Sequence, residues 1–341
     1  MQPRLIYASL TCRLGDTSRY LDKFSIVADS TNRSNTSPQI STAKFTMRSP
    51  LTLLALAALP LTSAINIISS NDDGWAEINI RQLFNALTTA GHSVVLSAPA
   101  ENKSGSGSSD EAPTSRTTAC QFSSCTAGGP TGSNASDPRL NWVNSYPVTS
   151  IAYGIDTLSP NLLNAPPDLA ITGPNVGSNL GLAVYVSGTV GAAHYASSTG
   201  IPAIAFSGAD GSPTAWDADV PAYSAIYADL AAKVAERVVS GGTPYLPENV
   251  WLNVNFPTIE GCTSPDDFRF VLSRIFTAVP LLSGEDVETC GGTRLPTESS
   301  VVGADGCYVS ISVGAPDKTD ADAAAQGVVL ETLGDLLSCL P

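Results

Sequence analysis

The stretch INIISSNDDGW, residues 65–75, decides the fold. Its first part alternates apolar and polar side chains, which predicts a β-strand over 65–70, and the polar turn NDDG follows at 71–74. Apolar residues at helical spacing then predict a helix over 76–90, and SVVLSAP at 93–99 predicts a second strand. A strand–helix–strand unit of this length is typical of a parallel sheet, whose ligands bind at the carboxyl ends of the strands.

The same alternation returns after residue 167. Further strands are predicted at 168–173, 201–208, 250–257 and 307–314, and helices at 189–198, 221–239 and 322–338. Between the two parts, residues 101–138 are rich in Gly, Ser and Thr and are expected to form an elaborated surface loop. We therefore predict one α/β domain over 65–341 with a C-terminal extension.

Composition narrows the class of protein. With 341 residues and 43% apolar side chains, the chain can build a full hydrophobic core. Its formal net charge of −14 argues against nucleic acid or an anionic membrane surface as a partner, because little positive charge is present to neutralise phosphates.

Residues 47–64, MRSPLTLLALAALPLTSA, have the pattern of a secretory signal peptide. The apolar run over 51–61 is too short for a bilayer, which takes roughly 20 residues. Because a signal peptide begins near the N-terminus, we expect Met47 to be the true start and residues 1–46 to be a non-native or disordered extension. A buried core helix or a signal anchor are the alternatives. The protein is expected to be secreted.

Cysteine usage agrees with export. Residues 65–341 carry six of the seven cysteines, with 10 basic and 28 acidic side chains, a net charge of −18. An even number of cysteines behind a secretory signal predicts up to three disulfides, with the pairing left open. The sequence Asn134-Ala135-Ser136 is a glycosylation site in a loop expected to be exposed.

Two stretches suggest a cation site. Adjacent carboxylates at Asp72 and Asp73 suit a hard divalent cation, which offsets their repulsion; the alternative is an Asx turn that caps the next helix. The loop after the second strand, Ser104–Ser109, either is flexible or supplies a further oxygen ligand. Its sequence Asn102-Lys103-Ser104 is formally another glycosylation site.

Two more stretches suggest a ligand. In ITGPNVGSNLG, residues 171–181, glycines allow close approach of the backbone, and Asn175 and Asn179 offer amide groups. Ser187-Gly188-Thr189 precedes a helix of small residues, so that free N–H groups and hydroxyls suit an anion such as phosphate. Plain N-capping by Ser187 is the alternative.

Familiar catalytic motifs are missing from the sequence. It has no G-x-S-x-G, and its two histidines, His92 and His194, fit a helix end and a packed helix position, so a Ser/His/Asp hydrolase is not expected. The Asp pair lacks the Asp-x-Asp spacing of phosphatases that form an aspartyl-phosphate. No G-x-G-x-x-G follows the first strand, which argues against a dinucleotide enzyme.

Taken in order, these stretches resemble the SurE family of survival-protein phosphatases and nucleotidases, in its secreted fungal-like form. The likeness spans about residues 65–315, and its matching elements are SNDDGW, APAENKSGSGSS, PDLAITGPNVGSNLG, VYVSGTVGAAHYASSTGIPAIAFSG, WLNVNFP and, more loosely, CYVSISVG. The chain departs from the family at Thr172-Gly173-Pro174-Asn175, where Ser-Gly-Ile-Asn is usual, and at the insertion 258–305.

The resemblance implies a fold and a set of site residues. The fold would be a Rossmann-like three-layer α/β sandwich with a mostly parallel sheet, assembled as a homodimer or homotetramer. The metal ligands carried over by motif are Asp72, Asp73, Ser104 and Asn175, of which the two aspartates are also catalytic. The residues facing the substrate phosphate would be Asn179, Ser187, Gly188 and Thr189.

The mechanism expected from this resemblance is hydrolysis of small phosphate monoesters, nucleoside monophosphates among them. One Mg²⁺ or Mn²⁺ would polarise the phosphoryl group and activate water, and either Asp72 or Asp73 would orient or deprotonate that water. The main alternative is a secreted, non-catalytic phosphate- or nucleotide-binding protein of the same fold. A metal-dependent esterase or deacetylase is disfavoured because no H-x-x-H pair is near.

Overall fold

A computed structural model of the protein describes residues 64–341. The interpretations of 1–46 as an extension and of 47–64 as a signal peptide therefore lie outside the described residues, apart from Ala64. No helix within the described residues combines the length and the apolar character that crossing a bilayer requires.

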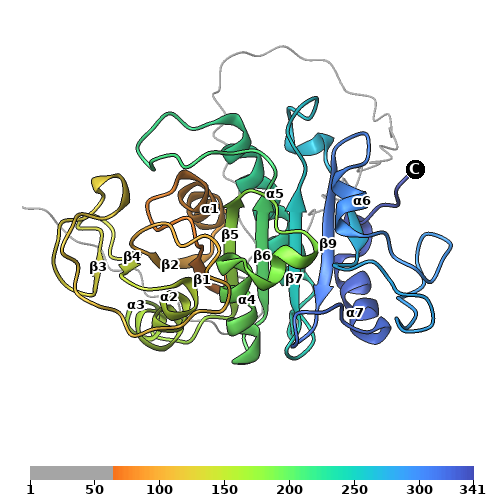
Figure 1. The fold of residues 1–341 in the computed structure, drawn as a ribbon, viewed down its shortest axis with the longest axis horizontal. Helices are drawn as coiled ribbons and strands as arrows, with labels where there is room; N and C mark the ends of the chain where they lie inside the picture. Colours follow the sequence, from red (N-terminus) through yellow and green to blue (C-terminus); the bar gives the residue numbers. More distant parts are fainter. Residues whose placement is uncertain (1–63) are drawn as a thin grey trace, which may run out of the picture. The chain divides into compact units, whose positions relative to one another are not determined.

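One nine-stranded sheet organises the described residues (Figure 1). Its spatial order is β3-β4-β2-β1-β5-β6-β7-β9-β8. The six neighbours from β4 to β7 are all parallel, whereas β3 pairs antiparallel with β4, and β9 pairs antiparallel with β7. The strands are β1 Asn66–Ser70, β2 Ser93–Pro99, β3 Thr131–Ser133, β4 Leu140–Val143, β5 Leu169–Val176, β6 Ala203–Gly208, β7 Trp251–Phe256, β8 Arg269–Ser273 and β9 Tyr308–Gly314. The mostly parallel sheet predicted from the sequence is confirmed.

Helices cover both faces of this sheet, as a three-layer sandwich requires. Ile67 of β1 packs with α1 and α5 on one face, and Ile68, the next residue, packs with α2 and α4 on the other. This alternation is the period of a strand buried on both sides. The helices are α1 Ile78–Thr89, α2 Pro147–Tyr153, α3 Ser159–Leu163, α4 Gly188–Ser198, α5 Ala222–Ser240, α6 Glu298–Val302 and α7 Ala323–Leu333, with a π-helical turn η2 Gly154–Leu158 between α2 and α3.

The order of the strands reverses beside β1. The chain builds β1, β2 and β4 in one direction, then crosses to β5 on the other side of β1 and continues through β6 to β7. In Figure 1 this is the step from the orange strands to the green ones. Because ligands of open α/β sheets bind at the carboxyl ends of the strands where the order reverses, the crevice between β1 and β5 is where a site is expected.

Three disulfides join the six cysteines of the described residues: Cys120–Cys125, Cys262–Cys307 and Cys290–Cys339. The first closes a short turn in the loop between β2 and β4. The other two fasten the C-terminal part, which contains β8, β9 and α7. Up to three bridges were predicted, and the structure contains three and supplies their pairing.

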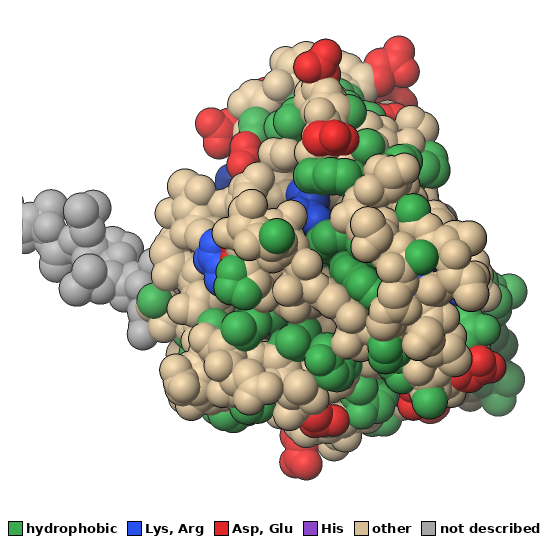
Figure 2. All heavy atoms as spheres, turned by 90° about the vertical axis from the view of Figure 1, so that its left-hand side faces the viewer, with side chains coloured by type: hydrophobic (Ala, Val, Ile, Leu, Met, Phe, Trp, Pro, Cys, Tyr) green, Lys and Arg blue, Asp and Glu red, His purple; other side chains and the backbone are tan. Residues whose placement is uncertain are grey.

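The loop predicted over 101–138 contains only short elements, a 3₁₀ turn at Gln121–Ser123 and the edge strand β3. The face on the β3 and β4 side shows a few Lys and Arg groups and scattered hydrophobic side chains, with Asp and Glu mostly at its margins (Figure 2). Asn134 directly follows β3, and its side-chain oxygen accepts the N–H groups of Ser136 and Asp137.

Candidate active site

The Asp pair follows β1 directly, at the crevice where the strand order reverses. Asp72 and Asp73 are each only 2% exposed. The preceding residue, Asn71, closes the turn: its side chain accepts the N–H of Gly74 and donates to the carbonyl of the same residue, both at 3.2 Å. Gly74 has a φ of +107°, which a residue with a Cβ rarely adopts. The turn thus fixes both carboxylates at the end of the strand.

Helix capping does not explain these aspartates. The N-cap of α1 is Glu77, whose carboxylate accepts the N–H of Asn79 at 2.6 Å. The helix begins at Ile78 instead of residue 76, so the turn NDDG stands clear of it. The capping alternative for Asp72 and Asp73 is therefore wrong.

Asp72 is held by the N-terminus of α4. Its Oδ2 accepts the backbone N–H of Gly188 at 2.9 Å, and its Oδ1 accepts the hydroxyl of Thr189 at 2.7 Å. Ser187 caps the same helix by accepting the N–H of Val190 at 3.1 Å. The anion at this helix N-terminus is thus the carboxylate of Asp72, in the position where helix dipoles favour negative charge.

Asp73 points toward β5 and the loop after β2. Its Oδ2 accepts the N–H of Val176 at 2.8 Å, and its Oδ1 accepts the side-chain amide of Asn102 at 3.4 Å. Asn102 also accepts the N–H of Ser104 at 2.8 Å, so it links the aspartate to this loop. The sequence pattern identified Asn102 only as a formal glycosylation site.

Burial makes both carboxylates hard to ionise. Loss of solvent raises the pKa of Asp72, against the lowering effect of the donors from Thr189 and Gly188. The pKa of Asp73 lies well above its usual range because of burial, then of the neighbouring Asp72, and then of Glu77. Two adjacent carboxylates of this kind call for a positive charge.

Asn175 has a free side-chain oxygen on β5, the strand beside the one that ends at the Asp pair. Its side-chain amide donates to the carbonyls of Val176 and Gly177, at 3.2 and 2.7 Å. That orientation turns Oδ1 away from these carbonyls, and no group of residues 64–341 donates a hydrogen bond to it. β5 continues to Val176, beyond the predicted end at residue 173, with a shift of register between Thr172 and Asn175.

Ser104 is exposed, and its hydroxyl makes no hydrogen bond to either aspartate within the described chain. It follows Lys103, whose N–H is bound by the carbonyl of Asp72 at 2.6 Å. Within this loop, it is the hydroxyl of Ser106 that comes close to Asp72. Its Oγ and the Cβ of Asp72 are 2.6 and 2.8 Å from the point where Gly188 would carry a Cβ, and this buried Oγ has no partner among residues 64–341.

A divalent cation fits this set of oxygens. Hard cations take carboxylate, amide and hydroxyl oxygens, and the residues at and next to the end of β1 carry two carboxylates, the free Oδ1 of Asn175 and the unpartnered Oγ of Ser106. Across residues 64–341 no three His, Cys, Asp or Glu side chains gather at metal-binding distance. Any cation here would therefore be held by two acidic and several neutral oxygens.

Asn179 is fixed by a buried polar network. Its N–H donates to the side-chain oxygen of Asn255 at 2.8 Å, its side-chain amide donates to Ser207 at 2.7 Å, and its carbonyl accepts the amide of Asn253 at 2.9 Å. Asn253 also donates to Glu298 at 2.6 Å. This network fixes Asn179 on the segment between β5 and α4 against β6 and β7.

Glu298 was not found by reading the sequence, because its partner Gly181 lies 117 residues away. Its side chain is fully buried, and burial, with a smaller effect of Asp320, raises its pKa to about 7. Glu77 was missed as well, and burial raises its pKa to about 8. His92 and His194 form no hydrogen bond with the aspartates; they contact Ile65 and Pro316.

The burial of Glu298 predicts a pH-dependent stability. Below its ordinary pKa of 4.5 the group is protonated in both states, and between 4.5 and about 7 the unfolded chain loses the proton first. The free energy of unfolding should therefore fall as pH rises through this window, by up to about 3 kcal/mol from this group. Urea unfolding at pH 5 and pH 8 should show a smaller difference in the Glu298→Gln variant than in the wild type.

The matched control for this prediction is Glu331→Gln, on the exposed face of α7, which should keep the wild-type difference. An unchanged difference in Glu298→Gln would mean that Glu298 is already ionised in the folded protein at pH 5.

Comparison with known protein sequences identifies a family and several named relatives. The sequence profile of the family described as Survival protein SurE matches residues 67–272. A protein of Yarrowia lipolytica named acid phosphatase is 30% identical over 288 residues, which cover 75% of this chain and 80% of that protein. The 5′-nucleotidase SurE of Lawsonia intracellularis is 31% identical over 195 residues, covering 57% of this chain and 67% of the relative.

A solved structure has the same fold. The SurE protein of Aquifex aeolicus superimposes with a TM-score of 0.53 over 74% of this chain and 94% of its own, at 24% identity. This likeness supports the α/β sandwich and, at such identity, the fold alone. With the family profile spanning the crevice from Asp72 to Thr189, the chain belongs to the SurE family of survival proteins.

Proposed function

We propose that the protein is a phosphomonoesterase of the acid phosphatase or 5′-nucleotidase type that depends on one divalent cation, Mg²⁺ or Mn²⁺. One observation carries the proposal: two adjacent, buried carboxylates, Asp72 and Asp73, end β1 at the crevice where the strand order reverses. Relatives named acid phosphatase and 5′-nucleotidase SurE support a phosphatase or nucleotidase activity. Small phosphate monoesters are the substrates that this implies.

Asp72, Asp73 and the Oδ1 of Asn175 would hold the cation, together with a hydroxyl of the loop 104–109. When bound, the cation would polarise the phosphoryl group and lower the pKa of the attacking water. Ser104 is the hydroxyl that the family pattern predicts, and the place of Ser106 beside Asp72 makes it the second candidate.

The N-terminus of α4 would keep Asp72 in place during turnover. Gly188 and Thr189 donate to its two oxygens, so this carboxylate stays oriented while Asp73 or Asp72 accepts a proton from water. Contact of Asn179, Ser187, Gly188 and Thr189 with the substrate phosphate stays a prediction. Asn179 supports it by its fixed position on the loop that leads to this helix.

The proposal extends to the organisation of the chain and to its location. Residues 65–341 would be the phosphatase domain with its C-terminal extension, exported after removal of the signal peptide at 47–64. Three disulfides among the described residues support an oxidising compartment. Glycosylation at Asn134 and assembly as a homodimer or homotetramer complete the proposal.

The test uses residues 65–341, produced in oxidised form and stripped of metal. It measures the release of phosphate from nucleoside monophosphates and from an aryl phosphate. Activity should return on addition of Mg²⁺ or Mn²⁺ and stay low in metal-free buffer. A folded protein that binds phosphate but releases none with either metal would favour the alternative, a non-catalytic phosphate- or nucleotide-binding protein of this fold.

A further inference from the structure

An exposed aromatic residue stands next to the proposed phosphate site. Tyr185 ends the 3₁₀ turn η3, Gly181–Tyr185, and is 44% exposed. It precedes Gly188, whose N–H binds Asp72, by three residues, a length of chain that spans at most about 11 Å. Its neighbours Leu182 and Val186 are 75% and 58% exposed. Apolar side chains this exposed at the edge of a site indicate a binding surface.

The ring of Tyr185 stacks on that of Phe276. Their centroids are 5.9 Å apart and the ring planes meet at 27°. The other side of η3 contacts the loop that follows β2, where the N–H of Gly107 donates to the carbonyl of Val186 at 2.9 Å. Tyr185 and Phe276, called here the aromatic pair, therefore stand on the same rim as the loop that carries Ser104 and Ser106.

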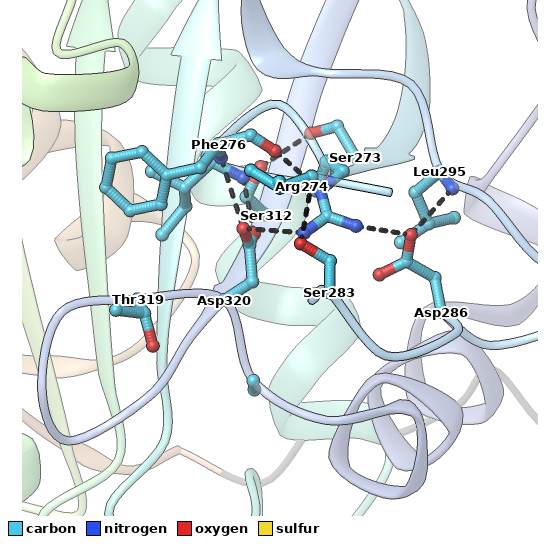
Figure 3. Close-up of polar contacts among 12 residues, drawn as sticks. Ser273, Arg274, Phe276, Ser283, Asp286, Leu295, Ser312, Thr319 and Asp320 are labelled. Atoms are coloured by element: carbon cyan, nitrogen blue, oxygen red, sulfur yellow. Dashed lines mark hydrogen bonds and ion pairs between the residues drawn. The ribbon is translucent and has the colours of Figure 1, made fainter. Parts of the chain in front are cut away.

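Buried ionic contacts fix Phe276 in place (Figure 3). Its N–H donates to Asp320 at 3.1 Å, and its carbonyl accepts the Nε of Arg274 at 2.6 Å. Arg274 forms an ion pair with Asp320 at 3.3 Å and another with Asp286 at 2.8 Å. Figure 3 shows the ring of Phe276 projecting away from these contacts, which leaves it free to stack.

Glu298 anchors η3, the turn that ends at Tyr185, and also contacts the segment that carries Phe276. Glu298 accepts the N–H of Gly181, the first residue of η3, at 3.0 Å, and its own N–H donates to the carbonyl of Arg274 at 2.9 Å. One buried framework thus holds both segments of the aromatic pair. Phe276, Glu298 and Asp320 all lie beyond residue 272, where the match to the family profile ends.

We propose that the aromatic pair is a subsite for a planar ring carried by the alcohol that the phosphate monoester releases, the nucleobase of a nucleoside or the ring of a phenol, which stacks on Tyr185. This inference rests on the proposed function. A planar ring carried by a phosphate bound near Asp72 would meet the exposed ring of Tyr185, while Leu182 and Val186 offer apolar contact beside it. The C-terminal extension would in this way set substrate preference.

Two substrates with the same scissile bond test the proposal. Adenosine 5′-monophosphate and ribose 5-phosphate both release a primary 5′-hydroxyl, and only the first carries a base. The wild type should favour the nucleotide in kcat/KM by about tenfold or more, the gain typical of a base stacked on an aromatic ring. Tyr185→Ala should lose most of that preference, and Tyr185→Phe should keep it.

The control is Val328→Ser on α7, an exposed apolar residue on the helix layer of α5, and it should keep the wild-type preference. Equal kcat/KM for the two substrates in the wild type, or an intact preference in Tyr185→Ala, would overturn the subsite. A change in sedimentation on Tyr185→Ala with no change in preference would also overturn it, since the pair would then be an interface between copies.

Failure of the proposed function gives a different result, because neither substrate would then be hydrolysed. In that case, adenosine binding measured by ligand-observed NMR tests the subsite independently of catalysis. Saturable binding that Tyr185→Ala removes and Tyr185→Phe retains would support it, and no binding by the wild type would refute it.

Discussion

Replacing Asp73 with asparagine is expected to lower kcat/KM for phosphate monoesters on the order of 10³-fold while the fold is kept. The amide can still accept the N–H of Val176, but it brings no charge to a divalent cation. Because two buried carboxylates repel each other when no cation is bound, the metal-free variant should melt at the same temperature as the wild type or higher. Phosphate release and thermal unfolding, each with and without Mn²⁺, measure both effects.

Asp229→Asn, on the exposed side of α5, is the matched control and should change neither quantity. The wild type should gain stability from Mn²⁺ by mass action, and Asp73→Asn should lose that gain. Near-normal turnover in Asp73→Asn would refute the role of this carboxylate in holding a metal.

Replacing Thr189 with valine is expected to weaken the affinity for the cation by about 10- to 100-fold, with a similar loss of turnover at limiting metal. Valine keeps the shape of this fully buried side chain but cannot donate to Oδ1 of Asp72. The carboxylate would lose one of the donors that stabilise its ionised form, so that it binds a cation less well. Titration of the metal-free protein with Mn²⁺, followed by calorimetry and by activity, measures the change.

Thr189→Ser restores the hydroxyl and should recover most of the affinity. A Thr189→Val variant that binds Mn²⁺ as the wild type does would show that Thr189 serves packing alone. Loss of turnover at saturating metal with normal affinity would instead place the hydroxyl on the substrate phosphate, as the sequence predicts.

Much of the sheet could be predicted because its strands are short apolar runs ended by turn residues. The strand before the Asp pair and the strand at Ser93–Pro99 were found almost to the residue. The predicted helix end at residue 90 is the C-cap of α1, and Gly91 after it has a φ of +99°. The segment from α2 to α3 was missed. Pro147, Gly154 and Pro160 interrupt its helical pattern, and a π-helical turn joins its pieces.

The residues of the crevice were predictable where function lies in a local motif, as at Asp72 and Asp73. Partners brought together by the fold were not. Nothing near Glu298 in the sequence points to Gly181 or Asn253, and whether Ser104 or Ser106 approaches Asp72 depends on the turn between them. Glu77 looks like an ordinary surface carboxylate before a helix, and only the fold buries it.

The C-terminal disulfides have a consequence for resistance to proteases. Leu281 and Leu282 protrude from the loop after β8, and exposed loop tips are where proteases cut first. A cut between these two residues would separate Cys262 from Cys307 along the chain, yet the bridge between them would keep both fragments joined. Glu298 and Asp320 would stay linked to the segments that they anchor, so a nicked molecule should keep Gly181 and Phe276 in place.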